Sequence, residues 1–133
     1  VLLYYLYVPS CSCRTPVVKS SRVAGLGVFA RRNYSAGDPI ETCPTVAVPW
    51  DTVRGKSRLE DYVFESARGG VQDVLVPLAN CGLYNHSESN NAYYQVRPNG
   101  TIAIFALLPI ARGNEITVNY GQAYWKSRGL TPA

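Results

Sequence analysis

Short apolar runs separated by glycine, proline and asparagine turns dominate the chain and predict a mainly β fold with little helix. Segments rich in valine, isoleucine, leucine and aromatic residues are typical of strands, and they lie at residues 1–8, 17–18, 27–31, 40–48, 92–96 and 102–107. The turn signal Pro98-Asn99-Gly100 predicts a hairpin between the last two segments.

Helical spacing is confined to short segments. Residues 59–67 place apolar side chains on one helical face, and Gly69-Gly70 follows as a stop signal. Residues 74–78 are expected to add one turn of helix. The segment after Gly121 is rich in aromatic and basic residues.

Length and composition indicate one small globular domain. The chain has 133 residues, of which 47% are hydrophobic and 17% are charged, so a disordered tail or a coiled coil is a poor fit. The longest apolar runs, residues 1–8 and 102–111, are shorter than the ~20 residues that span a bilayer. A membrane-spanning segment is therefore not expected. The chain contains no methionine, so its initiator has been removed or the chain is an excised or processed form, which leaves the loss of a targeting segment open.

The net charge is +4, and the basic residues are scattered along the chain. This distribution predicts a solvated basic face and gives only weak support for nucleic-acid binding. A small β module that binds single-stranded nucleic acid through its tyrosines stays open as an alternative.

The four cysteines, Cys11, Cys13, Cys43 and Cys81, do not form two closely spaced pairs, and His86 is the single histidine. That spacing disfavours a zinc site, so no metal is expected. The cysteines are expected to be buried reduced thiols, which favours an intracellular compartment.

Residues 25–30, Gly-Leu-Gly-Val-Phe-Ala, match the dinucleotide-binding fingerprint in form. The fingerprint requires a helix directly after the glycines, but residues 33–39 are rich in turn formers. A glycine turn that leads into a strand fits residues 25–30 better than a dinucleotide-binding loop. Because glycine has no side chain, a small ligand could contact the backbone of this turn directly.

Two other segments have ordinary structural explanations when each is considered alone. A lone histidine such as His86 is most often a satisfied structural side chain. Residues 115–121 predict a strand that ends at Tyr120, and Tyr124 and Trp125 would then belong to a core or an interface.

The order of the three segments is more informative. Gly-Leu-Gly at 25–27, Asn-His-Ser at 85–87 and Glu-Ile-Thr-Val-Asn-Tyr at 115–120 resemble the motifs of the SET-domain protein-lysine methyltransferases. The resemblance covers about residues 18–125, and the size of the chain is most similar to the minimal stand-alone SET proteins of viral type. It implies small twisted β-sheets around a C-terminal pseudoknot. Residues 1–133 would then be a single SET domain, with an N-terminal arm at 1–17 and a short tail without zinc at 122–133.

The resemblance also implies the site. The residues expected to hold S-adenosylmethionine, which would leave as S-adenosylhomocysteine, are Gly25, Leu26, Gly27, Val28, Asn85, His86, Tyr120 and Trp125. The catalytic residue is expected to be Tyr120, assisted by Tyr62 and Tyr124. The channel for the substrate lysine is expected to be lined by Tyr62, Leu83, Tyr84 and Tyr124.

The residue types suit methyl transfer to an amine. The attacking lysine must be neutral although its usual pKa is ~10.4, and no side chain stands out as a base. An aromatic channel would disfavour the ammonium form by desolvation, and bound substrates would gain from proximity.

The chain departs from the family pattern at two places. Glu88-Ser89-Asn90-Asn91 follows the histidine motif, so a cysteine and a proline frequent in the family are missing while Asn91 is kept. No cysteine follows Cys81, so the zinc-binding C-terminal extension of many members is absent, and Tyr124 and Trp125 or a partner must close the channel.

The expected partner is a lysine-bearing protein, with a histone tail as the default. Acidic side chains expected to line part of its groove are Glu60, Asp61, Glu65 and Asp73.

A catalytically silent SET fold that serves as a structural or peptide-binding subunit of a larger assembly is the alternative, and a homodimer is also open. Neither a membrane nor a nucleic acid is an expected partner. The nucleus, or a host nucleus, is the favoured compartment, and an organelle also fits.

Overall fold

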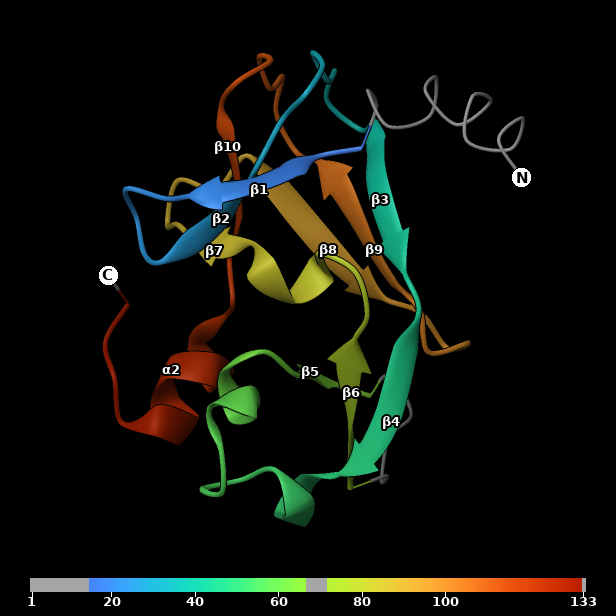
Figure 1. Ribbon diagram of the computed structural model, residues 1–133, viewed down its shortest axis with the longest axis vertical. Helices are drawn as coiled ribbons and strands as arrows, with labels where there is room; N and C mark the ends of the chain where they lie inside the picture. The colour runs from blue at the N-terminus through green and yellow to red at the C-terminus, as the bar shows by residue number, and fades with distance from the viewer. Residues whose placement is uncertain (1–14, 67–71, 133) are drawn as a thin grey trace, which may run out of the picture.

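A computed structural model describes residues 15–66 and 72–132 (Figure 1). Three small sheets make up the fold, which confirms the mainly β prediction. The strand expected at residues 1–8 lies outside the described residues. No helix in the described ranges is long and apolar enough to cross a membrane.

The first sheet has the strand order β1-β2-β10-β7. Its strands are β1 (Val17–Ser20), β2 (Leu26–Phe29), β10 (Glu115–Val118) and β7 (Asn85–His86). Strands β1 and β2 form an antiparallel hairpin, β10 adds antiparallel to β2, and β7 adds parallel to β10. This sheet therefore joins three segments that are far apart in the sequence.

The second sheet, β3-β9-β8, contains β3 (Pro39–Cys43), β9 (Ile102–Ala106) and β8 (Ala92–Val96). The predicted strand at 92–96 and the hairpin turn after it are confirmed, with the Arg97 N–H donating to Thr101 O at the turn. Gly100 takes a φ of 86°, a left-handed value that glycine adopts readily.

The third sheet, β4-β6-β5, contains β4 (Thr45–Pro49), β6 (Asp73–Pro77) and β5 (Phe64–Glu65). The single strand expected at 40–48 is wrong, because β3 and β4 belong to different sheets and Pro44 separates them. Proline has no N–H to donate, so a ladder is easily interrupted there.

Both helical expectations are wrong. Residues 74–78 fall largely within strand β6, which pairs with β4 and with β5. Within 59–67 the chain forms the short 3₁₀ helix η2 (Arg58–Asp61) and then strand β5, while residue 67 lies outside the described ranges. Phe64 and Glu65 form backbone hydrogen bonds with β6. These hydrogen bonds stabilise the strand more than a short isolated helix would be stabilised, because such a helix is only marginally stable in water.

The remaining helical elements are 3₁₀ helices η1 (Trp50–Thr52) and η3 (Cys81–Leu83) and the α-helix α2 (Gln122–Arg128). No helix was predicted at α2. It ends at Gly129, whose φ of 64° is the left-handed conformation usual after a helix.

The core lies between the first two sheets, where apolar strand residues face each other. Its largest fully buried side chains include Tyr84, Ile102, Ile104, Ile110, Ile116 and Val28. An isolated antiparallel β-bridge between Tyr34 and Ile110 joins the loop after β2 to the loop after β9. These packed strands form the support on which the glycine turn and the histidine motif are held.

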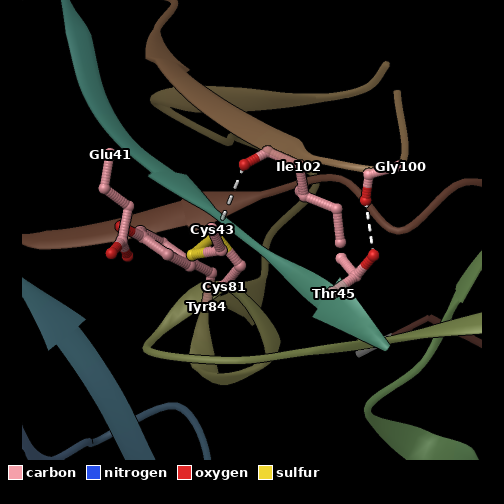
Figure 2. The surroundings of a disulfide bond; sticks show 7 residues. All are labelled: Glu41, Cys43, Thr45, Cys81, Tyr84, Gly100 and Ile102. Carbon is pink, nitrogen blue, oxygen red and sulfur yellow. Dashed lines mark hydrogen bonds between the residues drawn. A yellow bond between two sulfur atoms is a disulfide. The ribbon is translucent and has the colours of Figure 1, made fainter. Parts of the chain in front are cut away.

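A disulfide joins Cys43 at the end of β3 to Cys81 at the start of η3 (Figure 2). The expectation of reduced thiols is therefore wrong for this pair, and the argument for an intracellular compartment loses that support. Cys11 and Cys13 lie outside the described residues. The pair is separated by 38 residues in sequence but by 6.1 Å between Cα atoms, a proximity that only the fold creates.

Candidate functional site

Strand pairing brings the three sequence motifs to one sheet. Thr117 and Val118 of β10 pair with Asn85 and His86 of β7, and Ile116 of β10 pairs with β2. The chain leaves β10 toward Tyr120, so the glycine turn, the histidine motif and the C-terminal aromatics become neighbours. The pairing places both segments of the expected pseudoknot side by side.

The side chain of Asn91 holds the backbone of β10 in place. Its side-chain amide donates to Glu115 O at 2.9 Å, and its Oδ1 accepts the Thr117 N–H at 2.9 Å. An asparagine side chain thus substitutes for a neighbouring strand, because it offers a donor and an acceptor at the spacing of a backbone peptide.

The side-chain amide of Asn85 is directed at the glycine turn. Its Nδ2 lies 3.1 Å from Ala24 O, 2.9 Å from Leu26 O and 2.8 Å from Glu115 Oε1. Three acceptors around one atom require that atom to be the nitrogen. The Asn85 Oδ1 therefore points away from the turn.

Gly27 is required by the close approach of Glu115. A Cβ at Gly27 would lie 2.2 Å from Glu115 Oε1, which is inside van der Waals contact. The Ser21 hydroxyl lies 2.8 Å from both oxygens of the same carboxylate. Glu115 thus fastens the turn to β10, a role that sequence analysis did not assign.

The other residues of the turn differ in what they expose. Val28 is fully buried between its strand partners Val18 and Ile116, whereas Leu26 is 53% exposed. Gly25 has a φ of 42° and no atom near the position of a Cβ. This turn enters a strand and not a helix, which confirms that the dinucleotide fingerprint is only formal.

His86 links the two motifs through its ring. Its Nδ1 accepts the Tyr120 N–H at 3.1 Å, and its Nε2 lies 3.2 Å from Glu88 Oε1. An Nδ1 acceptor places the proton of the neutral ring on Nε2, where Glu88 accepts it. His86 is buried and satisfied, so it fixes the position of Tyr120 through its backbone.

The hydroxyl of Tyr120 donates to the Tyr84 carbonyl oxygen at 2.7 Å. Burial raises the pKa of Tyr120, and the nearby Tyr124 and Tyr62 raise it further. The hydroxyl is therefore protonated at neutral pH, its proton is committed to Tyr84, and its lone pairs are the part left to face a ligand.

Tyr120 stands in a cluster of aromatic rings. Its centroid lies 5.3 Å from that of His86, 4.6 Å from Tyr124 and 5.9 Å from Trp125, and the Trp125 ring is stacked on it. The Trp125 ring also meets His86 edge-on at 4.9 Å. The Trp125 Nε1 is buried without a hydrogen-bond partner within the described chain.

Tyr62, Leu83 and Tyr84 occupy different environments. Tyr62, at the end of η2, is 39% exposed, and its electrostatic effect on Tyr120 and Tyr124 places it on their side of the molecule. Leu83 is half-buried against the core. The Tyr84 ring lies in the core at 2% exposure, and the carbonyl of Tyr84 is the part that reaches Tyr120.

The Tyr84 hydroxyl donates to Glu41 Oε1 at 2.5 Å, beside the disulfide (Figure 2). Burial raises the pKa of Glu41, and burial with the adjacent carboxylate raises that of Tyr84. Glu41, Cys43 and Cys81 have ligand-type atoms within 4.8 Å of one another, but the two sulfurs are bonded to each other. This group is therefore a structural core element.

The four acidic residues expected at a groove do not gather at one place. Asp61 and Glu60 act electrostatically on Tyr124, whereas Glu65 acts on Tyr94 of β8. Asp73 stands at the far end of β6, opposite Pro49. Only the η2 pair lies beside the aromatic cluster.

The chain belongs to the SET domain family, whose family model matches residues 25–121. The matched range contains the glycine turn, Asn85, His86 and Tyr120. None of the curated proteins compared with the chain matches it significantly.

Solved structures support the family at the level of the fold. The chain is similar to a candidate histone methyltransferase of Plasmodium falciparum, with 31% identity and a TM-score of 0.72 over 84% of this chain and 97% of that one. It also resembles part of a Polycomb Repressive Complex 2 structure bound to S-adenosylmethionine, with 17% identity and a TM-score of 0.65. A humanized Chaetomium thermophilum form of that complex, bound to an inhibitor, gives 20% identity and 0.66. Each match covers 82% of this chain and 15% of the larger one.

Proposed function

We propose that this SET domain is an S-adenosylmethionine-dependent protein-lysine N-methyltransferase. The observation that carries the proposal is the Tyr120 hydroxyl, held by the Tyr84 carbonyl inside an aromatic cluster that adjoins the glycine turn and Asn85. Family membership supports the same chemistry.

The donors and surfaces present fit the cofactor. The backbone of Gly25, Leu26 and Gly27 and the outward Oδ1 of Asn85 suit its polar methionine end, since an amide oxygen accepts from an ammonium group. The ring of Trp125 suits the adenine, and its unpartnered Nε1 leaves a donor for a ligand acceptor. When bound, S-adenosylmethionine would supply the methyl group and leave as S-adenosylhomocysteine.

The chain prepares the lysine without a strong base. Aromatic surfaces from Tyr62, Tyr120 and Tyr124 desolvate the amine and so favour its neutral form. Tyr120 cannot serve as that base at neutral pH, because its pKa is raised and its proton is bonded to Tyr84. Its hydroxyl oxygen instead accepts a hydrogen bond from the amine and thereby orients the nitrogen lone pair.

A histone tail is the first substrate to test, because the Plasmodium falciparum relative is described as a candidate histone methyltransferase. Asp61 and Glu60 lie on the Tyr124 side of the site; Arg128 pairs with Asp61, so Glu60 carries the charge that would attract a basic peptide over short distances. The similarity to the minimal viral SET proteins stays a prediction.

Calorimetric titration with S-adenosylmethionine, followed by labelled methyl transfer to lysine-bearing proteins including histones, tests the proposal. Binding with transfer to a lysine is the expected result. Failure of the folded protein to bind would overturn the proposal and favour a silent SET-fold subunit.

A further inference from the structure

Arg128, the last residue of α2, contacts both η2 and the preceding turn of its own helix. Its Nε donates to Asp61 Oδ1 at 3.3 Å, and one terminal nitrogen donates to the Glu60 carbonyl oxygen. The other terminal nitrogen donates to the Tyr124 carbonyl oxygen at 3.1 Å. The guanidinium also lies over the Tyr124 ring, 3.8 Å from its centroid.

Two sets of contacts attach this helix to the rest of the described chain: the rings of Tyr124 and Trp125 pack around Tyr120, and Arg128 contacts η2. None of the side chains of α2 (Gln122–Arg128) is fully buried, and seven residues are too few to form a stable helix alone. Yet Tyr124 and Trp125, which pack around Tyr120, both belong to it. Figure 1 shows α2 beside the segment between β4 and β5 that contains η2.

We propose that Arg128 is a positioning residue that fastens α2 to η2 and thereby holds Tyr124 against Tyr120 on the lysine side of the site. The expected effect on catalysis rests on the proposed function. The attachment of α2 to η2 does not depend on it.

The planar fork of the guanidinium, more than its charge, carries the attachment. The Asp61 carboxylate is half-exposed, and such ion pairs contribute little because water screens them. The two carbonyl contacts and the stacking on Tyr124 require donors fixed in one plane, which lysine does not have. Arg128→Lys should therefore behave like Arg128→Ala, and Asp61→Asn should behave almost like the parent protein.

The fastening is tested without turnover in a Trp50→Phe background, where Trp125 is the remaining tryptophan. We expect Arg128→Ala and Arg128→Lys to shift Trp125 emission to the red and to speed amide exchange at Gly129 and Leu130, whose N–H groups close the helix end. Exchange in β9 should not change. Parent-like emission and exchange in both variants would overturn the proposal.

The consequence for the site is tested by methyl transfer. Arg128→Ala and Arg128→Lys should each lower kcat/KM by roughly 10-fold to 100-fold, because a misplacement of about 1 Å can cost ~10²-fold. Lys126→Ala, an exposed cation on the same helix, is the matched control and should be unchanged. Loosened α2 with undiminished transfer would refute the positioning role. Absence of transfer in the parent protein would refute the proposed function and leave the exchange result standing.

Discussion

Replacing Tyr120 with phenylalanine separates the role of its hydroxyl from that of its ring. The ring contacts with His86, Tyr124 and Trp125 do not involve the hydroxyl, so they should survive the change. The lost atom is the one that donates to Tyr84 O at 2.7 Å and presents its lone pairs to the substrate.

The expected magnitudes differ between stability and rate. Losing one half-buried hydrogen bond costs about 1 kcal/mol of unfolding free energy, and leaving the Tyr84 carbonyl unpaired raises this to at most ~3 kcal/mol. Removing one positioned polar group from a reacting centre lowers the rate by ~10²-fold or more, equivalent to ~2.7 kcal/mol of activation free energy.

The assay compares Tyr120→Phe with Tyr93→Phe, which changes a half-exposed tyrosine stacked on Phe105 in another sheet. Calorimetry with S-adenosylhomocysteine should give near-parent affinity for both variants, while labelled methyl transfer should fall only for Tyr120→Phe. Parent-level turnover in Tyr120→Phe would refute the assignment. An equal fall in both variants would show that the loss is not specific to the site.

Three further predictions concern the support of the site. Gly27→Ala should displace the Glu115 carboxylate, since its Cβ would lie 2.2 Å from Oε1, and should weaken cofactor binding by at least 10-fold in calorimetry, on the scale of losing a satisfied polar contact; unchanged affinity would contradict the fastening role of Glu115. Because burial raises the pKa of Glu41 above 4.5, the folded state holds that proton more tightly, so the contribution of Glu41 to the unfolding free energy should be fully present below pH 4.5 and should be lost as pH rises through the raised pKa. Urea unfolding across pH should show this slope, and Glu41→Gln should remove it; a slope that persists in the variant would assign it to another group. Reduction of the Cys43–Cys81 disulfide, which spans 38 residues, should lower the unfolding free energy by ~2–4 kcal/mol, and urea midpoints that do not move with reductant would refute this.

Strand predictions were accurate where the signal was local. The segment at 92–96 pairs with 102–106 across the Pro-Asn-Gly turn as expected, because segments containing β-branched and aromatic residues flank a strong turn sequence. The error at 59–67 has the opposite origin. Its helical spacing is real, but partners on β6 offer Phe64 and Glu65 a ladder that sequence does not reveal.

The sequence predicted which motifs form the site but not the contacts that arrange them in space. Glycine, asparagine and tyrosine at the right order along the chain point to one family, which the family match supports. Glu115, Glu88 and Arg128 were missed as contributors, because carboxylates and arginines are frequent on surfaces and nothing in their spacing marks them. The signal that could have identified Glu115 was its position as the first residue of the motif at 115–120.

The fold class, the family and the residue types of the site can be predicted from the amino-acid sequence, since these depend on local propensity and on motif order. The tertiary structure alone decided which of these residues meet. It turned the ring of Tyr84 into the core while leaving its carbonyl at Tyr120, joined Cys43 to Cys81, and attached α2 through Arg128. The physical reason is that such contacts depend on strand register and chain crossing, which bring distant residues within hydrogen-bond distance and which no local pattern encodes.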